Sequence, residues 1–228
     1  MNKLSSNVKI TAIICTLNEE SNLSLVLPRI PAWVDEVLLV DGHSSDNTIA
    51  VAQKLLPRIT VLRQPGKGKG DAIKYGVKHA KGELIVTLDA DGSTDPDNLK
   101  RFIQPLLDGF DFVKGSRFLG QKQPRMPTYR RFGNWVLVMT SNLLFGTKYT
   151  DLCSGYNAFR KEAFSKFNLI YDGFEMEQEM NVKIKKLGLK VIEIDCIDRG
   201  RNAGASKVGA IKQGFKDFII IIKERFNE

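Results

Sequence analysis

The sequence predicts an α/β fold in which a mostly parallel sheet carries helices on both faces. Apolar segments of strand length alternate with amphipathic segments of helix length, and polar residues follow directly after the strands. Segments such as residues 37–40 are apolar at every position, which is typical of strands buried on both faces. A chain of 228 residues fits one such domain. Ligands of these sheets bind beyond the carboxyl ends of the strands, where the polar residues lie.

Predicted strands and helices alternate in the first half of the chain. Strands are expected at residues 8–16, 36–41, 59–62, 84–89 and 112–114, and helices at 21–29, 48–56, 71–79 and 96–107. Asp71 and Asp95 stand at the starts of two helices, where a carboxylate can cap free backbone N–H groups. The order of strands and helices indicates a doubly wound sheet.

The second half is richer in helix. Helices are expected at residues 129–145, 175–187 and 206–227, with a strand at 190–195. The last helix is amphipathic because its apolar residues recur every three or four positions. We expect residues 1–205 to form the main domain. Residues 206–228 would form a helix that packs on it, contacts a membrane surface or mediates a homodimer.

The amino-acid composition limits which binding partners and which cellular compartment are expected. The net charge of +8 favours anionic partners. The aromatic–basic interleaving of nucleic-acid-binding proteins is absent, so no nucleic acid is expected. No apolar run approaches the roughly 18 residues of a transmembrane helix, and three scattered cysteines indicate a reducing compartment. We therefore expect a cytoplasmic protein, soluble or peripheral on the inner face of the membrane.

Asp89 and Asp91 are the most informative residues. They follow the apolar strand at 84–89 and lie one residue apart, so their charges repel unless a cation lies nearby. Mg²⁺ binds through one or two carboxylates together with phosphate oxygens, which suits this pair. One interpretation is a nucleotide-sugar transferase whose acids hold a metal on the diphosphate. The other is a phosphohydrolase with Asp89 as nucleophile, although that motif normally follows the first strand of its domain.

Other polar residues follow the remaining strands. Glu19 after the first strand and Asp41 after the second are candidates to accept hydrogen bonds from a nucleobase and ribose. Arg117 follows the fifth strand, where its fork of donors suits a phosphate. Arg201 and Lys207 form a second basic cluster before the last helix. The polar clusters at residues 16–19, 41 and 89–91 converge on one edge of the sheet, which is better evidence for a site than any one cluster alone.

Together these segments resemble the inverting GT-A-type glycosyltransferases of family 2, especially the dolichol- and polyprenyl-phosphate sugar synthases. The resemblance runs from about residue 8 to 207 and is carried by residues 16–20, 41–48, 66–76, 89–92, 115–117, 151–156 and 201–207. It implies a GT-A fold over residues 1–205. It also implies inverting transfer of a sugar from a nucleotide diphosphate to a polyprenyl phosphate. The alternative is the same chemistry onto a polysaccharide or another hydroxyl acceptor.

The resemblance also implies residue roles. The nucleotide-sugar site would comprise Cys15, Leu17, Glu19, Asp41, Asp89, Ala90, Asp91, Arg117, Arg201 and Lys207. Mg²⁺ or Mn²⁺ would be held by Asp89, Asp91 and Ser93. Catalysis would depend on Asp91, Arg117 and Asp151, with Asp151 on the acceptor side.

The acceptor decides whether a base is needed. A hydroxyl acceptor requires a carboxylate to take its proton, and the candidates are Asp151, Glu175, Glu177 and Glu179. A lipid monophosphate has a second pKa of about 6 and arrives ionised, so it requires arginines to position it. The basic cluster favours the phosphate acceptor, and it comprises Arg130, Arg131, Arg201 and Lys207. A catalytically inactive binding module is the non-enzymatic alternative.

Overall fold

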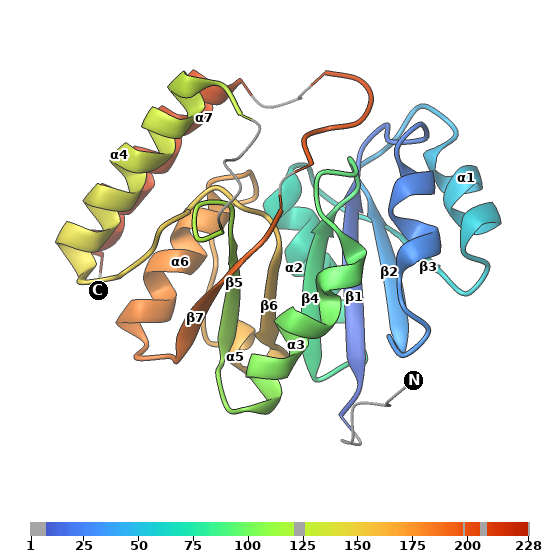
Figure 1. Ribbon diagram of the computed structural model, residues 1–228, viewed down its shortest axis with the longest axis horizontal. Coiled ribbons are helices and arrows are strands. Elements are labelled where there is room, and N and C mark those ends of the chain that lie inside the picture. Colours follow the sequence, from blue (N-terminus) through green and yellow to red (C-terminus); the bar gives the residue numbers. More distant parts are fainter. Residues whose placement is uncertain (1–7, 121–125, 198, 206–208, 228) are drawn as a thin grey trace.

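The computed structural model describes residues 8–120, 126–197, 199–205 and 209–227. These residues form a seven-stranded sheet in the order β3-β2-β1-β4-β6-β5-β7 (Figure 1). The strands are β1 (Ile10–Thr16), β2 (Glu36–Asp41), β3 (Thr60–Arg63), β4 (Leu84–Asp89), β5 (Phe112–Ser116), β6 (Asn157–Arg160) and β7 (Val191–Asp195). Only β6 pairs antiparallel with its neighbours β4 and β5. The prediction of a mostly parallel sheet is confirmed.

Seven α-helices accompany the sheet in the described part of the chain. They are α1 (Thr48–Leu55), α2 (Lys69–His79), α3 (Leu99–Leu107), α4 (Thr128–Phe145), α5 (Lys161–Ser165), α6 (Met176–Lys186) and α7 (Ala210–Phe226). Three short 3-10 turns are η1 (Leu23–Leu25), η2 (Leu27–Arg29) and η3 (Pro96–Asn98).

Two apolar layers cover the two faces of the sheet. Alternate residues of one strand point to opposite faces, so Ala12 and Ile14 join one buried cluster while Ile13 joins the other. The first cluster packs against α1 and α3, for example through Phe102, and the second against α2 and α6, for example through Met180. The prediction of helices on both faces is therefore confirmed.

Three local predictions were wrong. Residues 21–29 form η1 and η2 instead of an α-helix, because Pro28 lacks the N–H that a helix interior needs. Asp71 is not an N-cap, since α2 begins at Lys69 and the Asp71 carboxylate accepts from the Gly66 N–H at 3.0 Å. The strand β6 and the five-residue α5 were not predicted, because elements so short carry little periodicity. Asp95 does cap η3, as predicted.

Helices α4 and α7 lie side by side beyond the β5–β7 end of the sheet (Figure 1). A third apolar cluster joins them to α6 through Leu137, Val182 and Ile221. Large apolar side chains nevertheless stay exposed on both helices, among them Phe132, Trp135, Met139, Leu143, Ile211 and Phe215. None of the described helices is both long and apolar enough to cross a membrane.

Candidate active site

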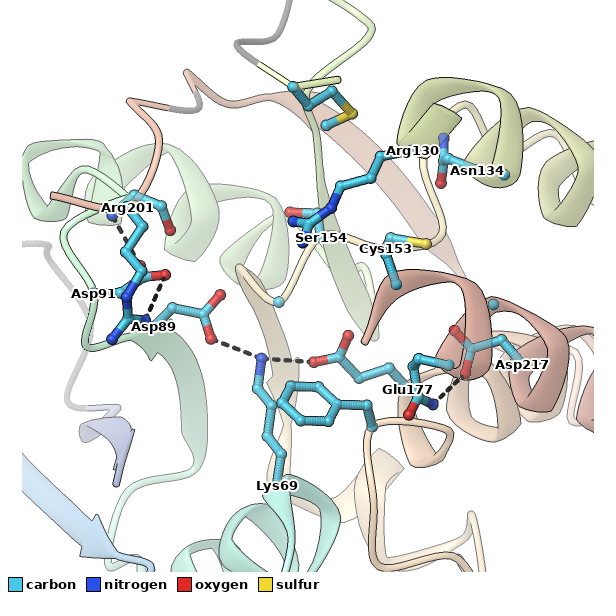
Figure 2. A pocket seen from close by; sticks show the side chains of 18 of the residues that line it. Lys69, Asp89, Asp91, Arg130, Asn134, Cys153, Ser154, Glu177, Arg201 and Asp217 are labelled. Carbon is cyan, nitrogen blue, oxygen red and sulfur yellow. Dashed lines mark hydrogen bonds and ion pairs between the residues drawn. The ribbon is translucent and has the colours of Figure 1, made fainter. Parts of the chain in front are cut away.

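One cavity of about 1010 Å³ opens at the carboxyl ends of β1 and β4 and extends between α4, α6 and α7 (Figure 2). Nine of the residues predicted for the site line it: Cys15, Leu17, Glu19, Asp89, Ala90, Asp91, Ser93, Arg117 and Arg201. Asp41 and Asp151 are fully buried and do not line it. Lys207 lies outside the described residues.

Lys69 bridges two carboxylates across the floor of the cavity. Its Nζ lies 2.7 Å from Asp89 Oδ1 and 2.9 Å from Glu177 Oε1. Burial alone would lower the pKa of Lys69, but the two carboxylates raise it well above its usual value. Gly155 makes room for this contact, because a Cβ there would overlap the ammonium and lie 2.7 Å from Asp89. Asp89 and Glu177 therefore share the positive charge of one protonated lysine.

Asp91 is held less firmly. Its Oδ1 accepts from the Ser93 N–H at 3.0 Å, and its Oδ2 lies 3.5 Å from Arg201 Nη1. Arg201 binds Glu19 more closely, with Nη2 at 2.7 Å from both carboxylate oxygens. The Asn202 N–H also donates to the Asp91 carbonyl at 3.1 Å. The loop after β7 is thus fixed against the loops after β1 and β4.

Arg117 and Asp151 form a bidentate ion pair. Arg117 Nε and Nη2 lie 2.6 and 2.9 Å from the two Asp151 oxygens. Asp151 also accepts from the N–H of Cys153 at 2.9 Å. Burial works to raise the pKa of Asp151, but the charge and hydrogen bonds of Arg117 lower it below its usual value. The carboxylate is fully committed to holding Arg117 at the wall of the cavity.

Asp41 carries a buried oxygen with unmet hydrogen-bonding capacity. Its Oδ2 accepts from the Ser44 N–H at 3.0 Å, whereas Oδ1 has no hydrogen-bond partner among the described residues. Such orphaned oxygens are rare in protein interiors. Gly42 and Gln64 beside it line the cavity. Gly42 and Gln64, and not the Asp41 carboxylate, therefore form this part of the cavity wall.

The residues predicted to hold a metal supply too few ligands by themselves, so a metal ion would also need phosphate oxygens of a bound ligand. No cluster of three or more potential metal-ligating side chains occurs in the ranges that the structure describes. Mg²⁺ typically takes one or two carboxylates and fills its remaining positions with water and substrate phosphates. Asp91 lines the cavity, and apart from the hydrogen bond from the Ser93 N–H its carboxylate makes only a 3.5 Å contact with Arg201, so it can still bind a cation.

Sequence reasoning did not find Asp217 on α7. The side chain is only 6% exposed and lines the cavity beside Glu177. Gln213 Nε2 donates to its Oδ1 at 2.8 Å. Burial, together with the charges of Glu177 and Glu175, raises the pKa of Asp217 to about 7, although Gln213 and Lys216 act in the opposite sense. One signal was present in the sequence: Asp217 directly precedes the apolar residues 218–222 of the helix.

This raised pKa predicts a pH-dependent stability. The folded state holds the Asp217 proton more tightly than the unfolded state, whose pKa is near 3.8, so the free energy of unfolding falls as pH rises between these values. Asp217→Asn removes the ionisation. We expect its unfolding free energy to exceed that of the wild type by a margin that grows by about 2–3 kcal/mol from pH 5 to 7 and then levels off. Urea unfolding across this range measures the margin, and a margin independent of pH would contradict the assignment.

Comparisons with known proteins identify the family. Residues 11–167 match glycosyl transferase family 2. Glycosyltransferase AglJ of Haloferax volcanii is 34% identical over 68% of this chain, which spans only 50% of that protein's length. Undecaprenyl-phosphate mannosyltransferase of Micrococcus luteus is 30% identical over 88% of this chain and 88% of its own length.

A solved structure has the same fold. Glucosyl-3-phosphoglycerate synthase from Mycobacterium tuberculosis, in complex with Mn²⁺, UDP and glucosyl-3-phosphoglycerate, matches with a TM-score of 0.75 at 19% identity. The match covers 96% of this chain and 80% of that one. The family favours a transferase over a phosphohydrolase. The chain belongs to glycosyl transferase family 2 and is a glycosyltransferase with the GT-A fold.

Proposed function

We propose that this enzyme transfers a sugar, with inversion, from a nucleotide diphosphate to a polyprenyl phosphate. The observation that carries the proposal is the composition of the cavity described above. Carboxylates and arginines line the end at the sheet, and the apolar side chains of α4 and α7 line the other end. A donor with a charged diphosphate and an acceptor with a charged head and an apolar tail both fit such a cavity.

The donor would occupy the end at the sheet. Glu19 lines the part of the cavity where the nucleoside would bind, with the buried Asp41 beneath it, and Asp89, Ala90 and Asp91 line the part where its diphosphate would follow. Asp91 would hold the metal, helped by Asp89 and Ser93. The bound Mg²⁺ or Mn²⁺ supplies positive charge to the departing diphosphate. Arg117 adds a positive charge of the chain itself, held in place by Asp151.

The acceptor phosphate would bind near Arg130. Arg130 extends from α4 into the cavity toward Ser154 (Figure 2), and its buried Nε has no hydrogen-bond partner among the described residues. A phosphate monoester is ionised at neutral pH and needs no base, and Asp151 is buried in its ion pair. We assign Asp151 a positioning role on this ground, in place of a role as base.

The apolar faces of α4 and α7 would meet the membrane from which the lipid comes. Phe132, Trp135 and Ile211 are more than half exposed, and Arg131 and Lys212 are exposed beside them. Aromatic and basic residues together favour the surface of an anionic bilayer. The name of the Micrococcus luteus relative, an undecaprenyl-phosphate mannosyltransferase, supports the same acceptor class. The protein would then act as a peripheral enzyme on the cytoplasmic face.

A transfer assay tests the proposal. Radiolabelled GDP-mannose and UDP-glucose are each supplied with Mg²⁺ or Mn²⁺ and a short polyprenyl phosphate in phosphatidylglycerol vesicles. We expect label to enter the lipid fraction from one donor, and the matching free polyprenol to accept none. Parallel reactions supply 3-phosphoglycerate in place of the lipid phosphate. Label in 3-phosphoglycerate or in the free alcohol, with none in the lipid phosphate, would overturn the assignment of the acceptor.

A further inference from the structure

A group of polar side chains on α6 and α7 lies beyond Lys69, on the side away from Asp91 (Figure 2). Glu177 and Asp217 are each at least nine-tenths buried, and both line the cavity. Gln213 joins the two helices, because its Nε2 donates to Asp217 at 2.8 Å and to Glu175 at 3.2 Å. The mechanism described above uses none of these residues.

Asp217 keeps an acceptor free for a ligand. Gln213 occupies Oδ1, while Oδ2 accepts no hydrogen bond from the described residues. A buried carboxylate that lies next to two others without a cation of its own costs free energy. Such an arrangement in a cavity points to a ligand that donates hydrogen bonds without carrying negative charge.

The position of the group relative to the donor site limits what that ligand is. Asp89 and Glu177 contact the same Lys69 ammonium, so only one ammonium group separates the diphosphate end of the cavity from Glu177. The next chemical group beyond the diphosphate of a nucleotide sugar is the sugar ring. Its hydroxyls are neutral donors that a carboxylate binds well. The Phe174 ring, whose centroid lies 5.7 Å from Lys69 Nζ, also lines this part of the cavity and offers an apolar face.

We propose that Asp217 and Glu177 bind hydroxyl groups of the transferred sugar, with Gln213 holding Asp217 in place. This proposal rests on the proposed function, because it presupposes a nucleotide-sugar donor. It gives α7 a part in selecting the sugar. A site that hydrogen-bonds a hydroxyl discriminates strongly against a sugar lacking that hydroxyl, because its buried polar groups then remain unpaired.

Binding measurements with and without the sugar test this assignment. Isothermal titration with Mg²⁺ present compares UDP with UDP-glucose and GDP with GDP-mannose on the wild type, Asp217→Asn, Asp217→Ala and Glu177→Gln. For the donor that the wild type prefers, we expect the Asp217 variants to weaken binding of the nucleotide sugar about 10- to 100-fold. Binding of the sugar-free diphosphate to these two variants should change less than about twofold. Asp108→Asn, an exposed substitution outside the cavity, is the matched control and should change neither.

Deoxy-sugar donors distinguish a direct hydrogen bond between Asp217 and a sugar hydroxyl from an indirect effect of the substitution. One of the 2-, 3-, 4- or 6-deoxy forms of the preferred sugar should bind the wild type as weakly as the parent donor binds Asp217→Ala. With that deoxy donor, Asp217→Ala should cause no further loss. If the Asp217 variants weaken the diphosphate and the nucleotide sugar equally, or weaken neither, the sugar subsite is wrong. If the wild type binds no nucleotide sugar at all, the proposed function itself fails.

Discussion

Asp91→Asn is expected to abolish most of the transfer activity while leaving the fold intact. The asparagine keeps an oxygen that accepts from the Ser93 N–H, so the turn after β4 persists. It loses the charge that would hold Mg²⁺ or Mn²⁺ on the diphosphate. Removing one group that stabilises developing charge costs about 10²- to 10³-fold in kcat. Initial rates of sugar transfer measure the loss.

Metal-dependent stabilisation gives a second readout for the same variant. A ligand that binds only the folded state raises Tm, and the rise grows with the logarithm of the ligand concentration divided by its Kd. Nucleoside diphosphate with Mn²⁺ should raise the Tm of the wild type and of the control Asp108→Asn, and should raise that of Asp91→Asn far less. Full activity in Asp91→Asn, or an unchanged response to Mn²⁺, would rule out Asp91 as the residue that holds the metal.

Strand ends explain how much of this site was predictable. Parallel strands have their carboxyl ends at the same edge of the sheet. The polar residues after β1, β4 and β5 therefore lie at one edge, and this follows from strand direction without knowledge of side-chain packing. Asp89, Asp91 and Arg117 accordingly line one cavity. Asp41 lies at the same edge but beneath the surface, since burial depends on the loops that cover it.

The ion pairs of the site could not be predicted, because they join segments that are far apart in the sequence. Lys69 meets Glu177 across more than a hundred residues of sequence, and Arg117 meets Asp151 across a loop and a helix. No local periodicity encodes such pairs. Whether a charged side chain can bind a ligand in the cavity depends on whether another side chain already forms an ion pair with it. Asp151 shows this most clearly, because the sequence made it a candidate base and the structure places both of its carboxylate oxygens against Arg117.

The ion pair also predicts the largest effect on stability. Asp151 is fully buried and satisfies the Arg117 side chain, the Arg117 N–H and the Cys153 N–H. Asp151→Ala removes the buried carboxylate that binds the mostly buried guanidinium at two points, and breaking a buried pair in this way typically destabilises a protein by about 3–5 kcal/mol. Urea unfolding should show this loss at pH 7 with an unchanged m-value.

A double substitution separates stability from catalysis. Replacing a buried pair by apolar residues of similar size is often neutral, so Asp151→Leu combined with Arg117→Met should recover most of the lost stability. Transfer activity should stay low in this double variant, because Arg117 is also the positive charge near the departing diphosphate. Recovery of activity together with stability would show that Arg117 serves only to support the fold. Loss of activity in a variant of restored stability would instead place the guanidinium in the chemistry.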